Sequence, residues 1–148
     1  MITPVLRVHD VDLSLRFYTH VLGFKGEGGL PGIDGKSVYA EAYLGDARVM
    51  FARRPPVSIG NICAAELYIQ LNTGIDELYR RLRAREVPIC HDLHEEIWGD
   101  QAFTIVDLDG NRISFAQRIT YAAQPAAQPA AQPAAQPPAL PVKLQQIA

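Results

Sequence analysis

The feature that most constrains this fold is an internal repeat with a period of 64 residues. The stretch LGDARVMFA, which begins at Leu44, and the stretch LDGNRISFA, which begins at Leu108, read as one unit written twice. The same shift aligns the starts of two helix-like runs, at Val11 and at Ile75. A long-period repeat is a signal about architecture, and two copies are too few for a solenoid. We therefore expect two similar modules packed into one domain.

Length and charge exclude several classes of protein. A chain of 148 residues with a net charge of −2 can form one domain with a real core, but it has no basic field for nucleic acid and no polybasic membrane patch. No run approaches the ~18 apolar residues of a spanning helix, and the start has no leader pattern. A cytoplasmic location is the expectation. Cys63 and Cys90 lack metal-type spacing and are expected to be reduced thiols.

Hydrophobic periodicity predicts the same order of elements, β-α-β-β-β, in each module. In the first module we predict a strand over 2–8, a helix capped by Asp10 or Asp12 and ending near Leu22, a short strand over 24–27, a mobile glycine-rich loop from Gly28, and a hairpin over 37–44 and 47–53. In the second we predict strands over 65–71 and 87–93, a helix over 75–85, and a hairpin over 103–106 and 112–117 around an Asp-Gly turn. The fold class is α+β, with both modules forming one curved mixed-sheet cup.

The domain boundaries follow from changes in composition. Module 1 covers residues 1–54 and module 2 covers residues 62–118, with a linker that runs from Arg53-Arg54-Pro55-Pro56 to Asn61. Residues 119–148 form a tail in which Ala-Ala-Gln-Pro is written four times, a composition that predicts an extended, disordered chain without a site. An alternative is that its last segment, Val142–Ile147, docks on a partner.

Three motifs occur in order along the chain: Leu-Arg-Val before the capping Asp, Phe-Tyr…Val-Leu-Gly-Phe, and Asp-x-Asp-Gly-Asn before the last strand. Together with the two modules they resemble the glyoxalase/bleomycin-resistance/extradiol-dioxygenase superfamily, also called the vicinal oxygen chelate fold, over about residues 2–118. The resemblance implies a cup built within one chain or across a homodimer. It does not imply one chemistry, since the superfamily uses this scaffold for isomerisation, ring cleavage, thiol transfer and drug binding.

In the metal-dependent members, the first and last strands of each module supply His, Gln or Glu ligands. The resemblance carries these positions onto Thr3, Met50, Glu66 and Ser114. Two hydroxyls, a thioether and one carboxylate are a poor donor set for a divalent metal. The resemblance therefore favours a binder without a metal cofactor, such as the bleomycin-resistance proteins, which also have an exposed Trp-Gly like Trp98-Gly99. A divalent metal remains the alternative.

The predicted ligand site lies on the strand faces that alternate away from the helices. Aromatic side chains there can stack on flat cationic or heteroaromatic ligands, whereas Arg48 and Arg112, if they point inward, favour an anionic ligand. The residues predicted to bind a small molecule are Thr3, Arg7, Met50, Glu66, Tyr68, Trp98, Arg112 and Ser114.

Two other functions are open. One is a lyase or dioxygenase-like enzyme in which Glu66 is the catalytic candidate and His91 and His94 complete an unconventional metal set. On a regular strand those histidines point to opposite faces, so this reading needs the chain to turn there. Glu66 also has a structural reading, as an ion-pair partner of a nearby arginine. The other function is an interaction module whose partner grips the proline-rich tail.

Overall fold

The computed structural model describes residues 2–55 and 64–120, which contain two copies of one module. The first module consists of β1 (Val5–Val8), α1 (Val11–Arg16), the π-helical segment η1 (Phe17–Leu22), β2 (Lys25–Pro31), β3 (Ser37–Leu44) and β4 (Ala47–Arg53). The second consists of β5 (Glu66–Leu71), α2 (Ile75–Ala84), β6 (Ile89–Glu95), β7 (Asp100–Val106) and β8 (Arg112–Arg118). The repeat therefore describes the architecture, while the predicted linker through Asn61 lies mostly, and the tail almost entirely, outside the described residues.

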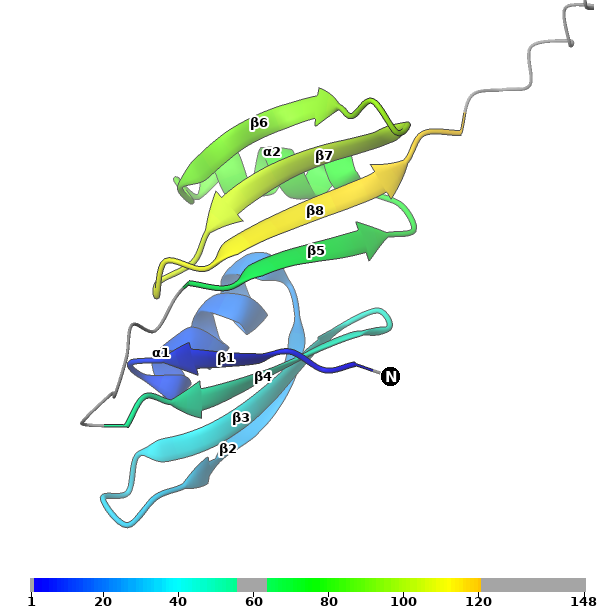
Figure 1. The fold of residues 1–148 in the computed structure, drawn as a ribbon. Helices are drawn as coiled ribbons and strands as arrows, with labels where there is room; N and C mark the ends of the chain where they lie inside the picture. Colours follow the sequence, from blue (N-terminus) through cyan, green and yellow to red (C-terminus); the bar gives the residue numbers. More distant parts are fainter. Residues whose placement is uncertain (1, 56–63, 121–148) are drawn as a thin grey trace, which may run out of the picture.

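Each module forms its own four-stranded mixed sheet. The strand orders are β1-β4-β3-β2 and β5-β8-β7-β6, and in both sheets the first and last strands of the module pair in parallel. The two sheets lie side by side, with β1 next to β5 (Figure 1). This arrangement is the duplicated cup predicted from the sequence.

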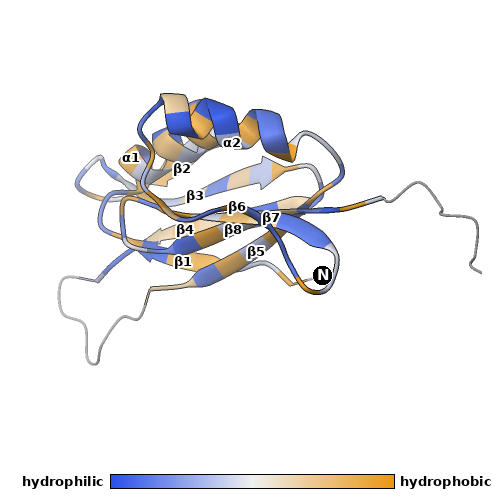
Figure 2. Cartoon of the chain, turned by 90° about the horizontal axis from the view of Figure 1, so that it is seen from above, coloured by the Kyte–Doolittle hydropathy of each residue, from blue (hydrophilic) through white to orange (hydrophobic). Residues whose placement is uncertain are grey.

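Helices cover only one face of this layer. Figure 2 shows α1 and α2 together on one side of the strands, while the opposite face has no helix over it. Alternate strand residues such as Leu6, Val8 and Ile69 are buried beneath the helices, with the four rings Tyr18, Phe51, Phe103 and Phe115 at the centre. Their neighbours Val5, Arg7 and Tyr68 are exposed on the helix-free side, which we call the open face. No helix in 2–55 or 64–120 is long and apolar enough to cross a membrane.

The first helix differs from the prediction in its second half. Asp10 caps it as expected, because its side chain accepts a hydrogen bond of 3.0 Å from the backbone N–H of Leu13. From Phe17 onward the segment is a π-helix rather than an α-helix, and it ends at Gly23 with a φ of +88°. A wider turn changes which side chains face the sheet, so the apolar stripe alone could not distinguish the two helix types.

Two strands also depart from the predicted pattern. The glycines at 28 and 29 belong to β2 rather than to a loop, because β2 pairs with β3 as far as Pro31 through register shifts after Glu27 and Leu30. Gly29 is required there: a Cβ at this position would lie 2.4 Å from the Ser37 hydroxyl oxygen. Strand β6 runs from Ile89 to Glu95, two residues later than predicted, and it too is irregular.

The turn between β7 and β8 joins the two modules. Asp107 is buried and accepts a 2.9 Å hydrogen bond from the Tyr18 hydroxyl of the other module. Asp109 accepts hydrogen bonds from the His9 backbone N–H, at 2.8 Å, and from the Ser14 hydroxyl, at 3.2 Å. Burial and the neighbouring charge of Asp107 raise the pKa of Tyr18 far above its ordinary value. The turn is therefore a structural lock as well as a hairpin connection.

A second contact gives module 1 a measurable pH dependence. The Ser37 hydroxyl donates to Asp12 Oδ1 at 2.6 Å and the Ser37 backbone N–H donates to Oδ2 at 3.2 Å, which lowers the pKa of Asp12 below 3.8. A lowered carboxyl pKa stabilises the fold above 3.8, and this contribution is lost as pH falls through the folded-state pKa. We expect Ser37→Ala to cost about 1 kcal/mol at neutral pH and progressively less in acid.

Urea unfolding of wild type and Ser37→Ala across a series of acidic pH values tests this expectation. Thr73→Ala, which alters an exposed hydroxyl at the start of α2, is the control and should show no pH-dependent difference from wild type. A stability gap between wild type and Ser37→Ala that stayed constant from neutral to acid pH would contradict the assigned role of the Asp12 carboxylate.

Candidate functional site

Strand register places one row of side chains across the open face of each sheet, because residues directly opposite each other point to the same side. In module 1 this row is Val5, Met50, Glu41 and Glu27. In module 2 it is Tyr68, Ser114, Thr104 and His91. The rows are equivalent in the repeat, except that the first strand is offset by 63 residues rather than 64. This offset is why Thr3 corresponds to Glu66.

The structure places the predicted ligand residues on or beside the open face, but it brings only some of them together. Glu66 lies opposite Arg112, and Tyr68 lies opposite Ser114. Trp98, in the turn before β7, donates a hydrogen bond of 3.3 Å from Nε1 to the Tyr68 hydroxyl. Thr3, Arg7 and Met50 belong to module 1, and no printed hydrogen bond joins them to the module 2 group. The predicted site is therefore two half-sites on one face.

The residues at the superfamily's metal positions do not fit a divalent metal. The Ser114 hydroxyl is already hydrogen-bonded to the Thr104 hydroxyl at 2.8 Å, and Met50 offers only a soft thioether. Glu66 is exposed and has neither an ion pair nor a hydrogen bond within the described chain. No group of three His, Cys, Asp or Glu side chains in residues 2–55 and 64–120 comes close enough to hold a metal ion.

The structure also shows where the two histidines of β6 lie. Register shifts in β6 pair His91 with Thr104 and His94 with Ala102, two positions on the same face of β7. The strand does turn between them, and the Arg112 guanidinium lies 3.3 Å from Nδ1 of His91. However, β5 and β6 are opposite edges of the sheet, so Glu66 is three strand spacings, roughly 14 Å, from these histidines. One metal ion cannot bridge that separation.

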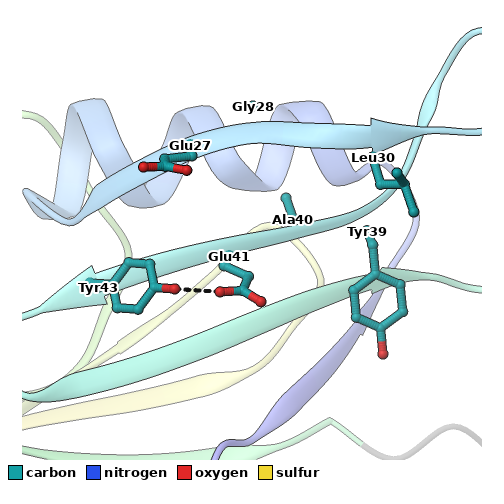
Figure 3. A pocket seen from close by; sticks show the side chains of 7 residues that line it. All are labelled: Glu27, Gly28, Leu30, Tyr39, Ala40, Glu41 and Tyr43. Carbon is teal, nitrogen blue, oxygen red and sulfur yellow. Dashed lines mark hydrogen bonds between the residues drawn. The ribbon is translucent and has the colours of Figure 1, made fainter.

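An aromatic pocket lies on the open face of module 1. It has a volume of about 440 Å³ and is lined by Glu27, Gly28, Leu30, Tyr39, Ala40, Glu41 and Tyr43. Figure 3 shows Tyr39, Glu41 and Tyr43 projecting from β3, with Glu27 on the neighbouring β2. They share a side because they alternate along a regular strand. Both tyrosines alternate as expected for pocket walls, but the sequence analysis did not single out Glu41 or Glu27.

Glu41 organises this pocket electrostatically. Its carboxylate accepts two hydrogen bonds from Arg48, at 2.6 and 3.1 Å, and one from the Tyr43 hydroxyl. These bonds, with Arg48 first, lower the pKa of Glu41, and the bond to Glu41 raises the pKa of Tyr43. Arg48 is therefore paired rather than free to attract an anion. Glu27, directly opposite Glu41 on β2, adds a second carboxylate to the pocket.

Asp100, which the sequence analysis overlooked, supports the other half-site. It is 3% exposed, and its Oδ2 accepts a 3.1 Å hydrogen bond from the Tyr68 hydroxyl. A smaller cavity of about 170 Å³ lies beside Tyr68 between β1 and β5. An aspartate in the sequence Trp-Gly-Asp reads as a turn residue, so no local signal identified its partner on a strand thirty residues earlier.

A duplicated β-α-β-β-β module with a cup on its open face defines a class of small-molecule binding and metal-enzyme scaffolds. Residues 2–115 match the family model described as Glyoxalase/Bleomycin resistance protein/Dioxygenase superfamily. The chain belongs to this superfamily.

Solved structures share the fold at low sequence identity. TioX from Micromonospora sp. ML1 superposes with a TM-score of 0.70 and 23% identity, covering 80% of this chain and 98% of TioX. A glyoxalase/bleomycin resistance protein/dioxygenase from Alicyclobacillus acidocaldarius gives 0.63 and 17%, covering 81% and 92%. Lactoylglutathione lyase from Agrobacterium tumefaciens gives 0.63 and 20%, covering 79% and 92%. No curated protein matches the sequence. These similarities extend to the fold alone.

Proposed function

We propose that this protein binds a flat organic molecule of drug or metabolite size on its open face, without a metal ion. The observation that carries the proposal is the chemistry at the superfamily's metal positions, where Met50 and Ser114 replace the imidazole and carboxylate donors that a divalent metal prefers. A protein with this scaffold and without these donors retains the cup as its functional feature.

The walls of the cup support a ligand with aromatic character. Tyr43, Tyr68 and Trp98 are each between 38% and 53% exposed, so part of each ring is available for stacking. In module 1, Glu27 and Glu41 face a single arginine, Arg48, and this balance favours a ligand that carries a positive charge near its rings. The combination supports the cationic or heteroaromatic ligands expected from the sequence over a purely anionic one.

Trp98 is the only tryptophan in the chain, so its fluorescence reports directly on the module 2 half-site. We expect at least one flat cationic drug in a small panel to quench it saturably. Trp98→Ala should then weaken that ligand, measured by calorimetry, at least about tenfold, since a stacking wall is lost.

The matched control is Leu108→Ala, which removes a side chain of similar exposure, 54%, from the β7–β8 turn. It should leave the affinity unchanged. Equal affinity in wild type and Trp98→Ala would show that the ligand does not stack on Trp98, and failure of every compound in the panel would count against the proposed class of ligand.

A further inference from the structure

Tyr68 and Trp98 form a connected corner on the open face. The indole Nε1–H of Trp98 donates to the Tyr68 hydroxyl oxygen at 3.3 Å, and that hydroxyl donates its own proton to Asp100 Oδ2 at 3.1 Å. The two rings, 53% and 50% exposed, keep open surface while their polar atoms point at each other. We call this group the Tyr68–Trp98 corner.

The backbone that carries Trp98 is fixed from several directions. Arg118 Nη1 donates to the Trp98 carbonyl oxygen at 2.6 Å, and the backbone N–H of Ile119 donates to the Gly99 carbonyl at 3.0 Å. The turn itself is closed by a 2.7 Å bond from the Glu96 N–H to the Asp100 carbonyl, and Gly99 has a φ of +83°. A ring held in this way is preorganised, so little rotational freedom is lost when a ligand stacks on it.

Asp100 is the buried element of the corner. Arg118 Nε lies 3.0 Å from Asp100 Oδ1 as an ion-pair partner but is not aligned for a hydrogen bond, and Oδ1 has no hydrogen-bond donor among the described residues. Burying a carboxylate with an incompletely satisfied oxygen is costly, so its retention calls for an explanation. A carboxylate only accepts hydrogen bonds, which fixes the direction of its bond with Tyr68.

That direction determines what the corner can offer a ligand. The single N–H of Trp98 and the single O–H of Tyr68 are both used within the corner. The Tyr68 oxygen can still accept a hydrogen bond, because a phenolic oxygen is both donor and acceptor. Burial, followed by the bond to Asp100, raises the pKa of Tyr68, so the proton stays on the hydroxyl at neutral pH.

We propose that Asp100 is a positioning residue that makes the Tyr68–Trp98 corner select flat rings carrying an N–H donor at their edge over rings of the same shape carrying an acceptor. The inference rests on the proposed function and specifies its ligand class. A ring donor completes the acceptor capacity of Tyr68, whereas a ring oxygen meets a lone pair and no proton. Stacking contributes equally to both kinds of ring, so the difference comes from one hydrogen bond.

Indole and benzofuran test this selectivity, because they share a shape and differ in an N–H against an oxygen. The Trp98 side-chain N–H gives a single ¹H–¹⁵N signal in the labelled full chain, and its shift on titration yields an affinity for each unlabelled probe. We expect indole to bind roughly three- to tenfold more tightly than benzofuran, as one net hydrogen bond provides. Tyr68→Phe should retain both rings with equal affinity. Asp100→Asn should reduce or reverse the preference, because an amide can donate to Tyr68 and release its proton.

A second Tyr–Asp pair supplies the control. The Tyr79 hydroxyl donates to Asp92 at 2.7 Å away from the corner, so Tyr79→Phe and Asp92→Asn should leave the indole-to-benzofuran ratio unchanged. If Asp100→Asn does not fold, Tyr68→Phe decides alone. Equal wild-type affinities, or a preference that survives in Tyr68→Phe, would overturn the selectivity and leave the proposed function standing. If neither probe moves the Trp98 signal, the corner is not a binding surface, and the site in module 2 fails with it.

Discussion

Asp107→Ala is expected to lower the free energy of unfolding by about 3–5 kcal/mol, the range for removing one partner of a buried charged network. Asp107 Oδ2 accepts hydrogen bonds from the Tyr18 hydroxyl at 2.9 Å and from Asn111 Nδ2 at 2.8 Å. Its Oδ1 accepts bonds from the backbone N–H groups of Asp109 and Asn111, at 2.9 and 2.8 Å. The substitution leaves all four donors without this acceptor, and Tyr18 cannot reach water.

Urea unfolding measures this loss. The control is Asp46→Ala, at the exposed turn of the β3–β4 hairpin, which should change stability by less than about 0.5 kcal/mol. A loss below about 1 kcal/mol in Asp107→Ala would mean that the turn does not hold the two modules together.

The second large effect is expected in the core. Phe51 and Phe115 are equivalent in the repeat, both are 0% exposed, and their rings contact Tyr18 at 4.7 Å and Phe103 at 5.5 Å between centroids. Replacing either by alanine should cost about 3–5 kcal/mol, since transfer free energy is lost and a cavity remains. Because the Asp107 turn joins the modules, each variant should still unfold in one transition.

Denaturation followed by Trp98 fluorescence and by circular dichroism distinguishes the outcomes. Trp98 reports on module 2, whereas circular dichroism reports on both modules. Leu13→Ala, a substitution at a residue 54% exposed on α1, is the control for loss of an apolar side chain and should have little effect. If Phe51→Ala shifted the circular dichroism transition but not the Trp98 transition, the modules would be independent units and the lock would be wrong.

Much of the fold followed from the sequence because it depends on periodic and local signals. The hairpin strands at Ser37–Leu44 and Ala47–Arg53 agree residue for residue with the alternation of apolar side chains. The 64-residue repeat predicted the second module from the first. The faces of β1 and β5 also agree, since a buried helix-side residue is followed by an exposed one in both.

The departures occur where tertiary contacts override local preference. Glycines 28 and 29 suggested a loop, but the close approach of Ser37 makes glycine the residue that lets β2 continue. The irregular register of β6 moves His91 onto the open face, which strict alternation could not reveal. Pairing across the sequence is also invisible locally, so the sequence did not show that Glu41 holds Arg48 or that Asp100 holds Tyr68.

The central claim is that the open face binds its ligand without a metal ion, and the most direct test is the affinity of the full chain for a ligand found with Trp98 fluorescence, measured before and after exhaustive EDTA treatment. The open-face donor set predicts the same dissociation constant in both preparations and no gain when Fe, Mn, Ni or Zn is added back. Affinity that disappears with the chelator and returns with one of these metals would contradict the claim and would make the chain a metal-dependent member of its superfamily.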